Sequence, residues 1–142
     1  MSYHLVTLLL GSNLGNSKNN INLALMAISE EIGCVIRKTQ VLETIPIEFV
    51  SNNIFCNIAI LIKTQFSPIK LLNSVKVIEV RMGRTKDSRS TSHYTDRIID
   101  IDIVQYGDLK FECLRLGIPH YKHLFERDFS RELLLDLENI KT

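Results

Sequence analysis

The stretch Arg97-Ile98-Ile99-Asp100-Ile101-Asp102-Ile103-Val104 decides how the rest of the chain is interpreted. Its β-branched residues are typical of a strand, and the side chains of a strand alternate between two faces. Asp100 and Asp102 would therefore share one face, roughly 6 to 7 Å apart, while the isoleucines between them point into a core. Neighbouring carboxylates repel each other unless a cation lies between them. The pair indicates either a platform for a hard divalent cation such as Mg²⁺ or an edge strand with a solvated polar face.

The composition is that of an ordinary globular chain. Its 142 residues are 45% hydrophobic and 23% charged, which predicts a single domain over residues 1–142. The formal net charge of +1 gives no bulk attraction to nucleic acid or to a membrane surface. Positive charge gathers locally, because the segment 81–97 contains five Lys or Arg residues and two Asp residues.

The cysteines and the N-terminus indicate a cytoplasmic protein. Cys34, Cys56 and Cys113 are odd in number and lack Cys-x-x-Cys spacing, so we expect reduced thiols rather than a disulfide framework or a zinc site. The apolar run Leu5 to Leu10 is too short for a signal peptide and has no basic lead. No apolar run reaches membrane-spanning length.

Periodicity and turn residues predict the element order β-α-β-β-α-β. A strand over 3–10 ends at the turn Gly11–Gly15, after which Asn16 or Ser17 caps a helix that Gly33 stops. The later elements are strands over 35–42 and 54–63, a helix from Ser67-Pro68 to Gly83, the Asp strand, a hairpin turn over 106–109 with a strand over 110–114, a helical turn with His123, Arg127 and Phe129, and a helix over 131–137. Two helices separated by a pair of strands favour an α+β fold. We predict a ferredoxin-like βαββαβ sandwich, with helices packed on an antiparallel sheet.

Three local features each allow two interpretations. Gly11–Gly15 is either a tight turn or a cradle for phosphate, and it lacks the lysine of a P-loop. Phe55 and Asn57 share a strand face, where they could sandwich and read a flat heterocycle or form an ordinary cross-strand pair. The polar segment 85–96 is either a plain surface loop or a basic lid that closes over polyphosphate.

Taken in order, these motifs resemble a known enzyme family over nearly the whole chain. They are Gly11-Ser12-Asn13-Leu14-Gly15, Glu43-Thr44-Ile45-Pro46, Phe55-Cys56-Asn57, Ile78-Glu79, Gly83-Arg84, the Asp strand and Pro119-His120. The sequence resembles the 6-hydroxymethyl-7,8-dihydropterin pyrophosphokinases of folate biosynthesis. The resemblance implies that the β,γ-pyrophosphoryl group of ATP passes to the pterin hydroxymethyl oxygen and AMP is released.

The resemblance also implies a role for individual residues. Asp100 and Asp102 would hold two Mg²⁺ ions, and Arg84, Lys86 and Arg97 would neutralise the polyphosphate. The pterin would be bound by Thr44, Ile45, Ile47, Phe55, Asn57 and Phe129, with Tyr94 as a lid. ATP would contact Leu72, Lys76, Arg97, Ile103, Arg115, His120, Tyr121 and Arg127, and Glu79 matches an acidic position of open role on this side. The partners expected are these two small molecules, without nucleic acid or membrane, and we expect a monomer.

The sequence departs from the family pattern at several positions. Ile45 and Glu48 stand where Pro and Gly are usual, Lys86 where Arg is frequent, Tyr94 where some members have Trp, and Gly117 where Thr is frequent. The departures leave open a catalytically inactive pterin- or nucleotide-binding module on the same fold, although such a module has no need of adjacent carboxylates. A metal-dependent phosphodiesterase or nuclease is disfavoured by the near-zero net charge. A purely structural domain would leave the Asp pair unexplained.

Overall fold

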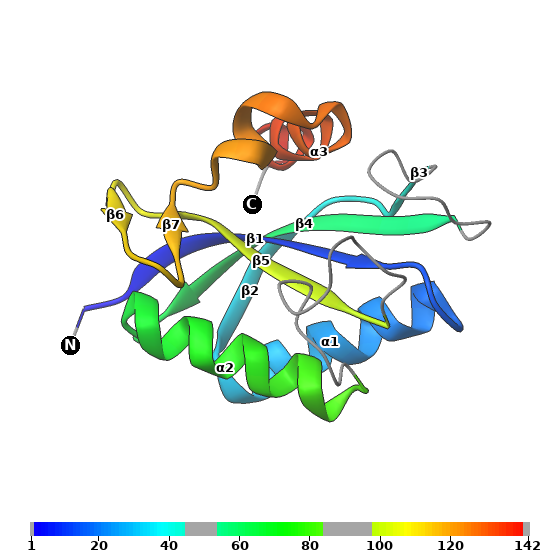
Figure 1. Cartoon of the computed structure of the whole chain (residues 1–142), viewed down its shortest axis with the longest axis horizontal. Helices are drawn as coiled ribbons and strands as arrows, with labels where there is room; N and C mark the ends of the chain where they lie inside the picture. Colours follow the sequence, from blue (N-terminus) through cyan, green and yellow to red (C-terminus); the bar gives the residue numbers. More distant parts are fainter. Residues whose placement is uncertain (1, 45–53, 84–97, 141–142) are drawn as a thin grey trace.

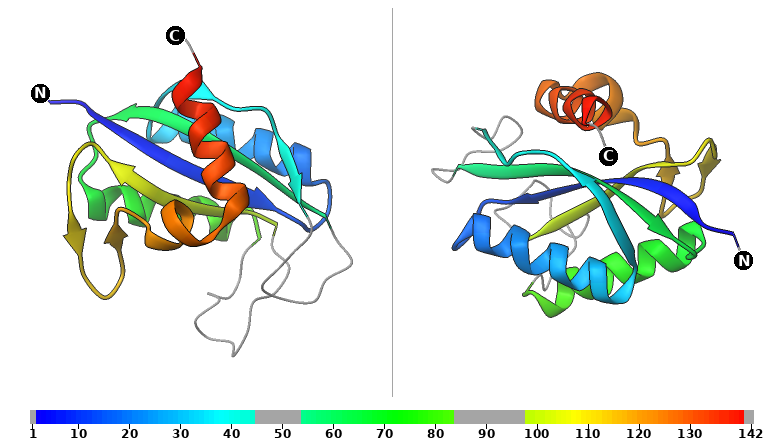
Figure 2. Two further views of the ribbon diagram at one scale, coloured as in Figure 1. Left: turned by 90° about the horizontal axis from the view of Figure 1, so that it is seen from above. Right: turned by 180° about the vertical axis from the view of Figure 1, so that it is seen from behind.

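The molecule is a twisted antiparallel sheet with helices on both faces, as seen in a computed structural model that describes residues 2–44, 54–83 and 98–140. Helices α1 (Ser17–Glu31) and α2 (Pro68–Arg81) lie side by side on one face, and α3 (Asp128–Asn139) lies on the other (Figure 1). Viewed from above, α3 crosses over the strands (Figure 2). This arrangement confirms the predicted α+β fold and adds a helix on the second face.

The strand order β2-β4-β1-β5 places two long strands at the centre of the sheet. The central strands are β1 (His4–Ser12) and β4 (Phe55–Thr64), flanked by β5 (Asp100–Tyr106) on one side and by β2 (Gly33–Lys38) and β3 (Leu42–Thr44) on the other. Every pairing in this sheet is antiparallel. The register shifts between Val35 and Arg37, so the outer strand β2 carries a bulge.

The predicted helix caps are confirmed. Asn16 is the N-cap of α1, where its side chain accepts a hydrogen bond from the Asn19 amide at 3.1 Å. Ser67 caps α2 in the same way through the Lys70 amide at 3.2 Å, and Pro68 occupies the first turn.

The first helix stops directly before Gly33, as predicted, but Gly33 does not have the positive φ of a glycine C-cap. The helix ends at Glu31, and Gly33 is the first residue of β2. A Cβ atom at Gly33 would lie 2.3 Å from the Lys63 carbonyl oxygen of β4. The glycine therefore serves the close approach of two strands rather than a helix C-cap.

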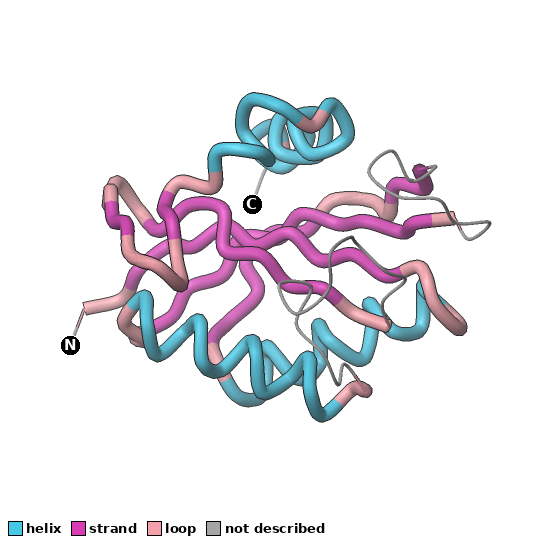
Figure 3. Tube along the Cα trace, in the orientation of Figure 1, coloured by secondary structure: helices cyan, strands magenta, loops and turns pink. Residues whose placement is uncertain are grey.

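The chain after β5 also differs from the prediction in its pairing. The predicted strand over 110–114 shortens to β6 (Phe111–Glu112), which pairs with β7 (Gly117–Ile118) and not with β5. The predicted helical turn is a π-helical turn, η2 (Lys122–Glu126). Phe129 belongs to α3, which begins three residues before the predicted start at residue 131. The turn η2 and the helix α3 lie on the same side of the sheet (Figure 3).

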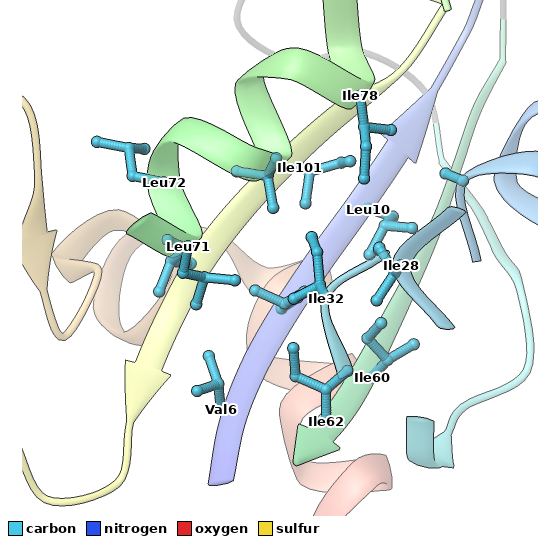
Figure 4. Close-up of a cluster of buried hydrophobic side chains, with 14 of the residues drawn as sticks. Val6, Leu10, Ile28, Ile32, Ile60, Ile62, Leu71, Leu72, Ile78 and Ile101 are labelled. Atoms are coloured by element: carbon cyan, nitrogen blue, oxygen red, sulfur yellow. The ribbon is translucent and has the colours of Figure 1, made fainter. Parts of the chain in front are cut away.

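Two hydrophobic cores lie on opposite faces of the sheet. The first core packs α1 and α2 against inward residues of β1, β4 and β5, among them Leu10, Ile60 and Ile101 (Figure 4). The second core is smaller and contains Leu9, Ala59, Val104, Leu133 and Leu137 under α3. Since side chains alternate along each strand, residues next to first-core positions point to the α3 face. In the part of the chain that the structure describes, no helix has the length and apolar character needed to cross a bilayer.

Candidate active site

The sheet register brings the predicted site residues together on the α3 face. Asn57 of β4, Gly11 of β1 and Asp100 of β5 form one cross-strand row. Two strand spacings separate the outer members, so the Asn57 and Asp100 backbones lie about 10 Å apart. The next row contains Ala59, Leu9 and Asp102. Because Leu9 and Ala59 belong to the second core, both carboxylates point to the α3 side, as the alternation along β5 predicts.

Gly11 lies in the middle of the first row, where two neighbouring side chains cover it. A Cβ atom there would lie 2.8 Å from Asn57 Oδ1 and 3.3 Å from Phe55 Cε1. The amide and the aromatic ring therefore already occupy the space above Gly11. Asn57 Nδ2 also donates to Thr44 Oγ1 at 3.3 Å. The structure thus gathers Thr44, Phe55 and Asn57, three residues of the predicted pterin pocket.

Asp102 is hydrogen-bonded to a histidine that the sequence did not single out for a role. His123 Nε2 lies 2.7 Å from Asp102 Oδ2, and His123 Nδ1 lies 2.6 Å from Ser130 Oγ. Burial raises the pKa of Asp102, but the hydrogen bond and charge of His123, with His120 and Arg127 nearby, outweigh it and hold the pKa well below the usual range. Asp102 is therefore an ionised carboxylate at neutral pH, as a metal ligand must be.

His120, which precedes η2, and Phe129 of α3 have rings close to that of His123. The rings of His120 and His123 are 4.2 Å apart, and Phe129 meets His123 edge-on at 6.4 Å. His120 Nδ1 is buried and makes no hydrogen bond within the described residues. Burial lowers the pKa of His120, although the Asp102 carboxylate acts in the opposite direction. Phe129, predicted to contact the pterin, packs partly on the second core.

The residues predicted to contact ATP fall into two groups. Tyr121 is exposed and packs on Phe125 at 5.1 Å, while Arg115 donates a hydrogen bond to Asn73 of α2. The side chains of Leu72 and Ile103 belong to the first core and are buried, so they offer little surface to a nucleotide. The assignment of these residues to ATP stays a prediction.

Glu79 is a buried link between α2 and β5. Its Oε2 accepts a hydrogen bond from the Ile101 amide at 2.7 Å, and its Oε1 lies 3.3 Å from Lys76 Nζ. Ile101 stands between the two aspartates, so Glu79 fixes the strand that carries them. The geometry describes a structural role, and a contact of Glu79 with ATP stays a prediction.

Six predicted site residues lie outside the described part of the chain. They are Ile45, Ile47, Arg84, Lys86, Tyr94 and Arg97. In the described part of the chain, the site is formed by residues of β1, β3, β4, β5, η2 and α3. Its oxygen donors, Asp100 and Asp102 on one face of one strand, are those that Mg²⁺ prefers.

Comparisons with known proteins give a consistent result. The family model described as 7,8-dihydro-6-hydroxymethylpterin-pyrophosphokinase matches residues 7–139. A 2-amino-4-hydroxy-6-hydroxymethyldihydropteridine pyrophosphokinase of Porphyromonas gingivalis is 33% identical over 134 residues, which is 94% of this chain and 90% of that protein. A mitochondrial folate synthesis bifunctional protein of Arabidopsis thaliana is 37% identical over 94% of this chain.

The chain matches only part of its bifunctional relatives. It spans 23% of the length of the Arabidopsis protein. The crystal structure of Plasmodium falciparum HPPK-DHPS superposes with a TM-score of 0.71 and 18% identity, over 99% of this chain and 41% of that one. This likeness supports the fold.

Proposed function

Because the chain belongs to the 7,8-dihydro-6-hydroxymethylpterin pyrophosphokinase family, we propose that it transfers pyrophosphate from ATP to 6-hydroxymethyl-7,8-dihydropterin. The hydroxymethyl oxygen attacks the β-phosphorus of ATP and loses its proton, while the bond from that phosphorus to the α–β bridging oxygen breaks. The products are AMP and the dihydropterin diphosphate, a step of folate biosynthesis. The strongest support for this reaction comes from the sheet register. The Asp100–Asp102 pair of β5 lies on the same sheet face as Asn57 of β4, with Gly11 of β1 between them.

The residues of the α3 face would divide the work between two substrates. Phe55 can stack on the flat pterin ring, and Asn57 can both donate and accept hydrogen bonds at its edge. The missing side chain of Gly11 leaves the space that the Asn57 amide and the Phe55 ring occupy. ATP would then approach from the side of β5 and α2, where Lys76 and Arg115 supply positive charge.

The carboxylates fit Mg²⁺, and we propose that Asp100 and Asp102 hold two such ions. When bound, Mg²⁺ would lower the pKa of the attacking hydroxyl and neutralise charge on the phosphates. Asp102 is suited to this task because its neighbours keep it ionised. Arg84, Lys86 and Arg97 would add positive charge to the polyphosphate site.

The domain organisation and the cellular location complete the proposal. Residues 1–142 would form a single pyrophosphokinase domain, which is supported by a family match over residues 7–139. We propose that this domain acts as a monomer. A cytoplasmic location is supported by three cysteines that are all free thiols, since thiols stay reduced in that compartment.

Product identity tests the function directly. The protein is incubated with ATP, Mg²⁺ and 6-hydroxymethyl-7,8-dihydropterin, and the nucleotides are separated by chromatography. We expect AMP that depends on the pterin, without ADP, and we expect EDTA to abolish it. The variant Asp102→Asn should fold but lose at least about a hundredfold in turnover, because a charged group at the reaction centre is removed.

Other products would contradict the proposal in distinct ways. Formation of ADP would mean phosphoryl transfer, with attack at a different phosphorus. Binding of pterin and ATP without turnover would favour the alternative, a catalytically inactive binding module. Full turnover by Asp102→Asn would remove the metal role given to that carboxylate.

A further inference from the structure

A buried hydrogen-bonded chain connects α3 to Asp102. It runs from Ser130 Oγ to His123 Nδ1 over 2.6 Å and from His123 Nε2 to Asp102 Oδ2 over 2.7 Å. Ser130 is fully buried and the side chain of His123 is 4% exposed, whereas that of Asp102 is 27% exposed. The chain therefore begins in the protein interior and ends at the open side of the site.

The ionised carboxylate fixes the direction of one hydrogen bond. A carboxylate of this kind only accepts, so Nε2 of His123 carries a proton and donates it to Asp102. The other ring nitrogen, Nδ1, is hydrogen-bonded to the Ser130 hydroxyl, which can either donate or accept. Both ring nitrogens are thereby occupied, and the plane of the ring is held from two sides.

The π-helical turn η2 places His123 for this contact. The Arg127 amide bonds to the Lys122 carbonyl at 2.9 Å, a five-residue spacing that widens the turn around His123. The rings of His120 and Phe129 lie near the His123 ring, at centroid distances of 4.2 and 6.4 Å. The imidazole therefore has a fixed position from which it donates a hydrogen bond to the Asp102 carboxylate.

From this geometry we infer that His123, anchored by Ser130, is a positioning residue that holds Asp102 in the orientation needed to bind a divalent cation. The inference rests on the proposed function. Occupation of Oδ2 by the imidazole sets the rotation of the carboxylate and leaves the Oδ1 lone pairs for the ion. Partners of this kind, which do not touch the metal, affect metal affinity or activity by about ten- to a hundredfold when they are removed.

The test measures metal binding without turnover. Mn²⁺ replaces Mg²⁺, and free Mn²⁺ is followed by electron paramagnetic resonance in the presence of a non-hydrolysable ATP analogue. The variant His123→Leu keeps most of the volume and removes both hydrogen bonds. We expect its Kd for Mn²⁺ to rise about ten- to a hundredfold. In His123→Gln the amide can still donate to Asp102, so most of the affinity should return.

Two further variants control the experiment. Ser130→Ala frees the imidazole at one end, and a smaller loss of Mn²⁺ affinity is expected. His4→Leu removes a histidine that packs on Tyr106 at 4.9 Å, and it should leave Mn²⁺ binding unchanged. Thermal unfolding without metal identifies any variant that fails to fold. If His123→Leu fails to fold, the Mn²⁺ affinities of Ser130→Ala and His123→Gln still test the inference.

Three outcomes would overturn the inference. One is unchanged Mn²⁺ affinity in folded His123→Leu and Ser130→Ala. Another is an equal loss in the Leu and Gln variants that merely follows their loss of stability. The third outcome is that the His123 variants lose Zn²⁺ binding but keep Mn²⁺ binding. The ligand atoms of Asp102, His120 and His123 lie within 4.8 Å of one another, so this result would make His123 a direct ligand of a transition metal.

The proposed function fails separately from this inference. Wild-type protein that binds Mn²⁺ with the ATP analogue but forms no AMP from ATP and pterin would refute the pyrophosphokinase. The comparison of the His123 variants would still report whether the imidazole orients Asp102.

Discussion

At the scale of single residues, Gly11 has a clear steric reason to be glycine. A methyl group there would meet Asn57 Oδ1 at 2.8 Å, closer than real Cβ contacts occur, and would press on the Phe55 ring. The residue lies in a strand with ordinary backbone angles, so the requirement comes from its neighbours across the sheet. The space that a side chain at residue 11 would fill is occupied by the Asn57 amide and the Phe55 ring, the two groups that would bind the pterin.

We predict that Gly11→Ala displaces the Asn57 amide and weakens pterin binding. The loss of about one hydrogen bond corresponds to roughly tenfold in Kd. Titration that follows the fluorescence of 6-hydroxymethylpterin measures it. Gly117→Ala is the matched control, because no atom lies within 4 Å of a Cβ atom there. If Gly11→Ala bound the pterin as tightly as the unchanged protein, the pocket would not lie over Gly11.

The Asp pair could be predicted from sequence at this scale, whereas its partner could not. Strand alternation alone puts Asp100 and Asp102 on one face, and the structure agrees. His123 is 21 residues from Asp102 along the chain, and only the packing of η2 and α3 brings it to the carboxylate. No local pattern around His123 or Ser130 signals that contact.

At the scale of elements, Glu79 ties α2 to the strand of the aspartates. The carboxylate is almost fully buried and accepts a hydrogen bond from the Ile101 amide at 2.7 Å. A local ion pair with Lys76, which the three-residue spacing on a helix favours, is also present at 3.3 Å. The tertiary bond to β5 could not be foreseen, because it depends on how α2 packs.

We predict that Glu79→Met lowers the free energy of unfolding by roughly 2 kcal/mol, since it leaves the Ile101 amide buried without an acceptor. Urea unfolding followed by circular dichroism gives the value. Glu31→Met is the matched control: it breaks an exposed ion pair with Arg81 at 2.7 Å, and the loss should be much smaller because exposed ion pairs contribute little to stability. Equal losses in both variants would show that the link to β5 contributes no more than a surface pair.

Helix boundaries illustrate where sequence prediction succeeded and failed for elements. Asn16 and Ser67 cap their helices as predicted, because capping is decided by residues three positions apart. The reason for Gly33 was not foreseen, because its constraint is the Lys63 carbonyl, 30 residues further along the chain. The pairing of β6 with β7 was missed for a different reason, because strands of two residues are too short to show an alternating pattern.

At the scale of the whole molecule, the sheet separates two cores of different size. The larger core packs against α1 and α2. The smaller core packs against α3, on the face where Asp102 is hydrogen-bonded to His123. The sequence predicted helices on the sheet but not their division between the faces. Short amphipathic helices carry no signal of which face they cover.

We predict that Leu133→Ala destabilises the protein by about 2 to 5 kcal/mol, because the side chain is fully buried under α3. Leu135→Ala, on the exposed side of the same helix, should change stability by less than about 0.5 kcal/mol. Thermal and urea unfolding of both variants provide the comparison. A similar small effect of the two substitutions would mean that α3 is not packed on the sheet as described.

The bulge in β2 has a consequence for how copies of the protein behave in concentrated solution. An unpaired strand edge is a template on which another chain can add, and it leads to aggregates. A near-neutral protein of net charge +1 has little overall repulsion to prevent this. In β2 the ladder is interrupted between Val35 and Arg37, and Arg37 and Lys38 follow at once. The irregular, cationic edge therefore protects the protein from edge-to-edge stacking where its total charge does not.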